Sequence, residues 1–76
     1  MELDQFVENV RNQFDETDPS EINASTEFKK LDEWSSLIAL SLIAMADEEY
    51  DVTLKGDDIK NANTVEDLFN TVKSKK

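Results

Sequence analysis

A run of apolar residues in the middle of the chain places the tightest constraint on its fold. From Leu37 to Ala46 every residue except Ser41 is apolar, in a chain of 76 residues. A helix over this run, ending near Tyr50, would be apolar around most of its circumference, so other elements have to enclose it on several sides. We therefore expect residues 36–50 to form the central helix of the fold.

At 100° per residue, the expected central helix has two opposite faces. The face expected to be buried carries Ala39, Leu42, Ile43, Ala46 and Tyr50, and the face expected to be exposed carries Leu37, Ser41, Ala44 and Glu48. The exposed face begins at two serines, Ser35 and Ser36, one of which should cap the helix by accepting a hydrogen bond from a free amide. Trp34 is expected to pack near the helix start and to fix the segment that presents the serine.

Three further segments show helical patterns. Residues 3–14 should form an amphipathic helix, residues 57–61 a short helix after Gly56, and residues 64–73 a helix that begins with a pattern resembling a capping box. The sequence thus predicts an all-α fold, a small bundle of three main helices and one short helix. Its core should consist mainly of Phe6, Val10, Phe14, Leu42, Ile43, Tyr50, Ile59, Val65 and Phe69.

Residues 15–33 form a first connection that is longer than a compact domain normally leaves without structure. The segment Asp18-Pro19-Ser20-Glu21 combines an N-cap residue, a proline at the first helical position and an acid at the third, which predicts a single helical turn. The residues expected to anchor this connection to the core are Ile22, Phe28 and Leu31.

The chain is strongly acidic, since 18 Asp and Glu residues against eight Lys and Arg residues give a net charge of −10. Such a surface repels nucleic acids and anionic membranes, and it favours protein partners with basic surfaces. No apolar stretch approaches the roughly 18 residues of a membrane span. We expect a single domain over residues 1–76 that is a cytoplasmic monomer, with a basic, frayed tail at 73–76.

The composition removes most catalytic and metal chemistry. The chain has no cysteine and no histidine, so it lacks the usual thiolate nucleophile, the usual general base at neutral pH and the commonest metal ligand. One glycine cannot supply a phosphate-binding loop, and Asp57-Asp58 lacks the pattern of a calcium loop. We therefore expect no catalytic residue and no metal site, and a protein that carries or contacts something.

Ser36 is the residue best placed for a function, and two interpretations of it are open. It is either a plain helix-start residue or a hydroxyl that another protein modifies. In the second case, a phosphodiester on its oxygen would lie against unpaired amides at the positive end of the helix dipole. The residues alone do not choose between the two.

As a whole, the chain resembles acyl carrier proteins from about Leu3 to Val72. The likeness rests on the order and spacing of several short pieces taken together. These are Phe28 and Leu31, Ser36-Leu37 with Leu42, Glu48-Glu49-Tyr50-Asp51-Val52 with Leu54, Asp58-Ile59, and Thr64-Val65 with Asp67-Leu68. The resemblance implies a four-helix bundle of the acyl-carrier type with a long first loop.

The resemblance also implies a function. A magnesium-dependent phosphopantetheinyl transferase would attach 4′-phosphopantetheine from coenzyme A to Ser36, which matches the family's serine because a leucine follows it directly. The thiol of the arm would then hold acyl or aminoacyl groups as thioesters. Enzymes with basic surfaces would load and receive these groups, in the biosynthesis of fatty acids or polyketides or in related lipid metabolism.

Two positions depart from the family's pattern. Ser35 stands where an aspartate that helps to bind metal is usual, and Asp32 or Glu33 could supply that charge instead. Acids that usually follow the serine are replaced at Ile38 and Ser41, which favours a specialised carrier with its own partner enzymes. The residues expected to bind partners are the apolar Leu37, Ile38 and Met45, the polar Ser41, and the acidic Asp47, Glu48 and Glu49.

Several alternatives stay open. The departure at Ser35 allows a diverged, carrier-like adaptor that is no longer modified, and the charge alone allows an acidic module that binds a basic protein. The small residues Ala39, Ala44 and Ala46 either permit close helix packing or leave room for an acyl chain. In the second case, the room would lie beside Leu40, Ile43, Ile59 and Leu68.

Overall fold

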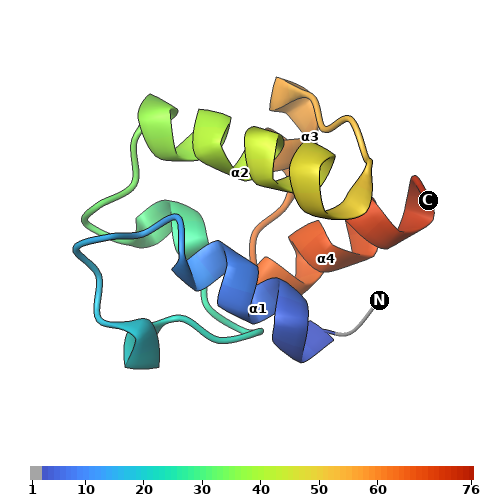
Figure 1. The fold of residues 1–76 in the computed structure, drawn as a ribbon. Helices are drawn as coiled ribbons and strands as arrows, with labels where there is room; N and C mark the ends of the chain where they lie inside the picture. Colours follow the sequence, from blue (N-terminus) through green and yellow to red (C-terminus); the bar gives the residue numbers. More distant parts are fainter. Residues whose placement is uncertain (1–2) are drawn as a thin grey trace.

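The computed structural model describes residues 3–76, and within this range its regular elements are all helices, joined by loops (Figure 1). Four α-helices and two short 3-10 turns follow one another in the order α1 (Leu3–Arg11), η1 (Pro19–Glu21), η2 (Phe28–Lys30), α2 (Ser36–Tyr50), α3 (Gly56–Asn61) and α4 (Val65–Ser74). The prediction of an all-α bundle with three main helices and one short helix is confirmed. None of the helices within residues 3–76 has the length and apolarity that a membrane crossing requires.

Helix α2 spans one side of the bundle, with α1 and α4 next to each other beneath it and α3 beside its C-terminal half (Figure 1). The ring of Phe6 joins these layers, because its centroid lies 5.7 Å from the ring of Tyr50 and 5.5 Å from that of Phe69. A cluster of buried apolar side chains fills the interior. Aromatic pairs at these separations stabilise a core beyond the area that they bury.

Most of the predicted core is buried, and two differences stand out. Phe6, Val10, Phe14, Leu42, Tyr50, Ile59, Val65 and Phe69 are all buried, whereas Ile43 is only partly buried. Leu40, which the sequence placed beside an interior space, is 62% exposed. Ile38 and Met45 are buried in its stead, so the inward face of α2 is turned relative to the expected one.

The first helix is shorter than predicted, ending at Arg11 instead of residue 14. The amides of Gln13 and Phe14 donate to carbonyls only three residues back, at 3.0 Å each, so the chain tightens before it leaves the helix. Phe14 remains buried all the same. The tighter turn carries its ring toward the residues that precede α2.

The long first loop wraps the end of the bundle where α2 begins (Figure 1), and the predicted helical turn is present in it as η1. The Asp18 carboxylate accepts hydrogen bonds from the backbone amide and the hydroxyl of Ser20, at 2.9 and 2.8 Å. Ile22 and Phe28 are fully buried, and Leu31 packs partly buried against the core. These contacts confirm that the loop is anchored rather than slack.

The loop also supplies acceptors to the start of α4. The carbonyls of Ala24 and Thr26 accept the amides of Glu66 and Val65, at 2.9 and 3.1 Å. The first amides of a helix have no partner within the helix, so here the first loop satisfies them. Thr64 and Asp67 complete the cap, since each side chain accepts from the other's backbone amide at 3.1 Å.

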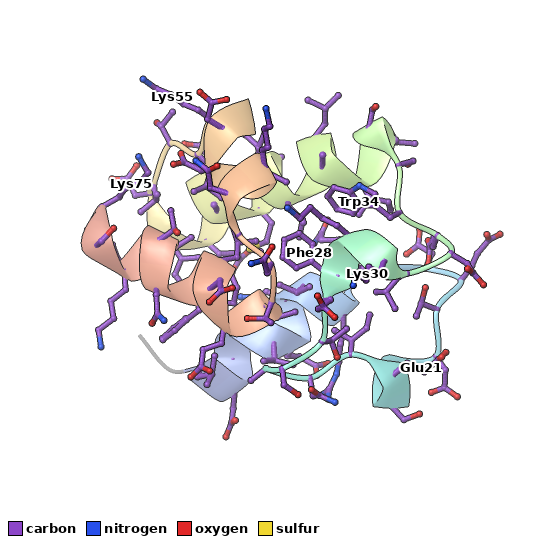
Figure 2. All side chains as sticks on the ribbon, turned by 180° about the vertical axis from the view of Figure 1, so that it is seen from behind. Glu21, Phe28, Lys30, Trp34, Lys55 and Lys75 are labelled. Atoms are coloured by element: carbon purple, nitrogen blue, oxygen red, sulfur yellow. The ribbon has the colours of Figure 1, made fainter. Side chains whose placement is uncertain are left out.

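The basic C-terminus contacts two other elements. The Lys75 ammonium lies 3.4 Å from the Asp58 carboxylate of α3, and the Lys76 ammonium lies 5.9 Å from the centroid of the Tyr50 ring. Lys75 and Lys55 both lie at the end of the molecule that carries α3 and the end of α4 (Figure 2). Whether residues 73–76 fray in solution stays a prediction.

Acid should destabilise the fold through its capping carboxylates. Hydrogen bonds from backbone amides hold the pKa of three aspartates below the ordinary value of 3.8. The donor is Ser20 for Asp18 and Lys55 for Asp58, and Asp67 accepts from both Thr64 and Asn63. A group whose pKa is lowered on folding contributes stability above its unfolded pKa and loses it as the pH falls through the folded pKa. We expect the melting temperature to fall from about pH 4 downward. The melting temperatures of the wild type and of Asp67→Asn should approach each other as the pH falls below about 4, because the variant lacks one of these titrating carboxylates. A difference in melting temperature that stays constant between about pH 6 and about pH 3 would contradict the prediction.

Candidate functional site

The two serines at the start of α2 have different roles. Ser35 is the N-cap, with φ −160° and ψ 172°, and its Oγ accepts the amide of Ile38 at 3.3 Å. Its carbonyl accepts the amide of Ala39 at 3.0 Å, which begins the helical ladder. Ser36 is the first residue within the helix and is exposed. Within residues 3–76, no hydrogen bond engages the Ser36 hydroxyl.

The backbone around Ser36 suits an anion. The amides of Ile38 and Ala39 are used by Ser35, while those of Ser36 and Leu37 precede the first possible partner in the helical ladder. These amides lie at the positive end of a 15-residue helix, where negative charge is stabilised. A phosphodiester on the Ser36 oxygen therefore fits the residues that the chain places there.

Three aromatic rings support the segment before Ser36. The indole of Trp34 lies near parallel to the ring of Phe14, at 6.5 Å and 26°, and edge to face with that of Phe28, at 5.4 Å and 70°. Figure 2 shows Trp34 and Phe28 side by side between η2 and α2. The Trp34 amide also donates to the Leu31 carbonyl at 3.0 Å. The prediction that Trp34 packs near the helix start is confirmed.

The two acids that could stand in for the missing aspartate differ in their surroundings. Asp32 is exposed, and within the described residues no hydrogen bond engages its carboxylate. Glu33 is partly buried, and its Oε1 accepts the amide of Glu16 at 3.0 Å and the hydroxyl of Thr17 at 2.7 Å. No group of three or more acidic residues in the described part of the chain is arranged to hold a metal ion.

The exposed face of α2 carries apolar residues near the site and acids further on. Leu37 and Leu40 are 71% and 62% exposed, and Asp47, Glu48 and Glu49 are also exposed. Leu40 lies four residues after Ser36 and seven before Asp47, so all three share one side of the helix. The sequence spacing of Leu40 from Ser36 and Asp47 indicates that Leu40 faces outward. The apolar residues around Leu40 made this spacing hard to recognise from the sequence.

Two of the residues expected to offer apolar contact to partners are not at the surface. Ile38 is 8% exposed and Met45 is 4% exposed, because both belong to the face that packs on the core. The prediction that their side chains meet a partner is corrected accordingly. Ser41 is partly buried at the edge of a shallow groove between α1 and α2, which Asn9 and Gln13 also line.

The expected space for an acyl chain is also changed by the position of Leu40. Ile59 and Leu68 are buried and Ile43 is partly buried, but Leu40 faces outward and does not line an interior. Ala46 is buried within α2, whereas Ala44 is exposed. Of the three alanines, Ala46 is thus the fully buried one that permits close packing.

A family model described as phosphopantetheine attachment site matches residues 5–72, which is most of the chain. The chain belongs to this family. It is a carrier protein and not an enzyme, and 4′-phosphopantetheine is its covalently attached cofactor. No curated protein and no solved structure matches the chain significantly.

Proposed function

We propose that Ser36 is the residue that carries 4′-phosphopantetheine, and that the protein holds acyl or aminoacyl intermediates on this arm. One observation carries the assignment: the hydroxyl of Ser36 is exposed and unengaged within the described residues, while that of the neighbouring Ser35 caps the helix. The arm, when attached, supplies a thiol that forms thioesters with carboxylic acids. The family match supports a chain that carries this arm.

The role of the chain in its own modification follows from this geometry. The Ser36 oxygen attacks a phosphorus of coenzyme A, so that an Oγ–P bond forms as the P–O bond to adenosine 3′,5′-bisphosphate breaks. The hydroxyl proton leaves with a base of the transferase or with solvent. Two amides at the start of α2 then lie near the phosphodiester, whose negative charge the helix end stabilises.

The exposed face of α2 is the proposed docking face for the transferase and for the enzymes that exchange acyl groups. Leu37 and Leu40 offer an apolar surface beside the attachment point, and Asp47 and Glu48 offer negative charge about 10 Å beyond Leu40 along the helix. Glu49 is exposed as well and adds its charge from the groove between α1 and α2. A fitting partner has an apolar depression next to its active site and basic residues about two helical turns beyond that depression. Ser41 lies at the margin of this face.

We expect the two parts of the docking face to act differently on partner enzymes. Leu40→Ala should raise the KM for the carrier about threefold to tenfold, with the salt dependence unchanged, because apolar contact area is lost. Glu48→Gln should weaken the salt dependence of the rate, because it removes a charge that attracts basic partners. Steady-state kinetics with one partner at low and high salt separate the two effects. A Leu40→Ala variant with wild-type KM would remove Leu40 from the docking face.

The assignment of Ser36 is tested by intact mass. The purified protein is incubated with coenzyme A, magnesium and a phosphopantetheinyl transferase, and the expected result is a mass gain of one arm. Loading with an acyl group should then add a second increment that hydroxylamine removes, since hydroxylamine cleaves thioesters. No gain with several transferases, including that of the host, would favour an unmodified adaptor. An unmodified protein that binds a defined basic partner would favour an acidic interaction module.

The choice between a general and a specialised carrier rests on the same face. No acid follows Ser36 within α2 until Asp47, so the first three turns of the helix offer partners apolar and small residues instead of charge. We infer that partners adapted to an acidic helix start use this protein poorly. Enzymes of general fatty acid synthesis should therefore show a higher KM for it than for their own carrier, and equal KM values would contradict the inference.

A further inference from the structure

Glu33 ties the segment before Ser36 to the turn that follows α1. One oxygen of its carboxylate accepts two hydrogen bonds, from the Glu16 amide at 3.0 Å and from the Thr17 hydroxyl at 2.7 Å. Hydrogen bonds to an ionised carboxylate are stronger than those between neutral groups. Glu33 lies 17 positions after Glu16 and 16 positions after Thr17, so these bonds join the two ends of the long first loop.

The neighbouring residue makes a second contact with the same turn. The indole of Trp34 stacks on Phe14, two residues before Glu16 in the chain. Two adjacent residues, Glu33 and Trp34, thus hold residues 14–17 by a carboxylate and by a ring. Ser35 and Ser36 follow directly, so the position of the Ser36 hydroxyl depends on how firmly these two contacts hold.

The same bonds argue against Glu33 as a source of free charge. The carboxylate is partly buried, and its Oε1 is occupied by two donors from within the chain. If the Glu33 carboxylate bound the metal ion of a transferase, that bond would compete with its hydrogen bonds to Glu16 and Thr17. Asp32 is exposed and its carboxylate accepts no hydrogen bond within residues 3–76, so it can supply the charge that helps to bind the metal.

We propose that Glu33 is a positioning residue for the modification of Ser36, acting through its bonds to Glu16 and Thr17. The proposal rests on the proposed function, because it assumes that a transferase modifies Ser36. Loss of the carboxylate leaves the segment free to sample other arrangements. A protein whose competent arrangement is only partly populated binds its enzyme with an affinity reduced by that fraction, so the defect falls on KM and spares kcat.

The test compares Glu33→Ala, Glu33→Gln and Thr17→Val as substrates of one transferase. Glu33→Ala should raise the KM about tenfold with kcat unchanged. Glu33→Gln should stay within about threefold of the wild type, since its amide oxygen can accept both bonds without a charge. Thr17→Val should show an intermediate KM, because it removes one donor at nearly constant shape. Glu21→Gln is the control, because Glu21 is an exposed acid that lines a shallow surface pocket together with Thr17 and Glu33, and its carboxylate makes no hydrogen bond within the described residues.

A second readout needs no transferase. Hydrogen exchange of the Trp34 amide, which donates to the Leu31 carbonyl, should quicken about tenfold in Glu33→Ala and little in Glu33→Gln. Kinetics are measured at a temperature where melting curves show every variant folded, so that unfolding does not contribute.

Each outcome bears on one proposal. A wild type that gains no mass overturns the proposed function and this proposal with it. A modified wild type with a Glu33→Ala variant of equal KM overturns the positioning role alone. If Glu33→Gln is as poor as Glu33→Ala and the loss is in kcat, the carboxylate acts by its charge and the positioning role is wrong.

Discussion

Replacing Ser36 by alanine should abolish the mass gain of one phosphopantetheine arm, while replacing Ser35 by alanine should leave it. Ser36 supplies the exposed oxygen at the first position of α2, and Ser35 lies one residue outside the helix with its hydroxyl engaged. Intact mass spectrometry after incubation with coenzyme A, magnesium and a transferase reads out both variants. No other substitution in the chain is expected to remove modification completely and leave the fold intact.

The same two variants should differ in stability in the opposite sense, because Ser35→Ala, which keeps the modification, should be the less stable of the two. Ser35→Ala removes the oxygen that caps the Ile38 amide and should cost about 0.5–2 kcal/mol in the free energy of unfolding. Ser36→Ala replaces an exposed first-turn residue by a good helix former, so its stability should stay within about 0.5 kcal/mol of the wild type. This crossed pattern separates the attachment role from the capping role.

The reverse result would be decisive. If Ser36→Ala is modified and Ser35→Ala is not, the two hydroxyls have exchanged roles and the assignment of the site is wrong. Ser35→Asp is a useful third variant, because aspartate also caps helices and restores the charge that the family pattern has at this position. Faster transfer to this variant would show that the neutral Ser35 limits the reaction.

The second large effect should come from two leucines that lie two residues apart on α2. Leu42→Ala should reduce the free energy of unfolding by about 2–5 kcal/mol, because the side chain is fully buried and leaves a cavity. A domain of this size has about 4–11 kcal/mol in total, so the variant should be close to unfolding. Leu40→Ala should change stability by no more than about 0.5 kcal/mol, since that side chain is 62% exposed.

Urea denaturation followed by far-UV circular dichroism measures both variants under one condition. The substitution is chemically identical and lies within one helix, so the difference in helix propensity cancels and the difference in burial remains. Equal losses of stability at the two positions would mean that Leu40 packs inside the bundle. That outcome would also remove it from the proposed docking face.

Much of the fold follows from signals that act over a few residues. The apolar run from Leu37 to Ala46, the Asp18-Pro19 start of η1 and the Thr64–Asp67 capping box each specify a local conformation, and the structure contains all three elements. Hydroxyl and carboxylate caps act on amides two or three residues away, so they can be recognised without knowing the rest of the chain. The position of Ser36 at the start of a helix is of this kind.

The contacts that hold the site in place could not be predicted in this way. Glu33 bonds to Glu16 and Thr17 across a long loop, and the carbonyls of Ala24 and Thr26 cap a helix some 40 residues later in the chain. A polar side chain or a loop carbonyl can bond to many partners, and its own neighbours in sequence do not determine which. The path of the whole first loop has to be known first.

By itself, the sequence determined that the chain is helical, where its central helix lies and that two serines stand at the start of that helix. Only the tertiary structure decided which side of α2 faces inward, placing Ile38 and Met45 in the core and Leu40 in solvent. The physical reason is that α2 is apolar on nearly every side, so its own pattern barely favours one orientation. Packing against α1, α4 and the first loop chooses among orientations that the helix alone leaves almost equal in free energy.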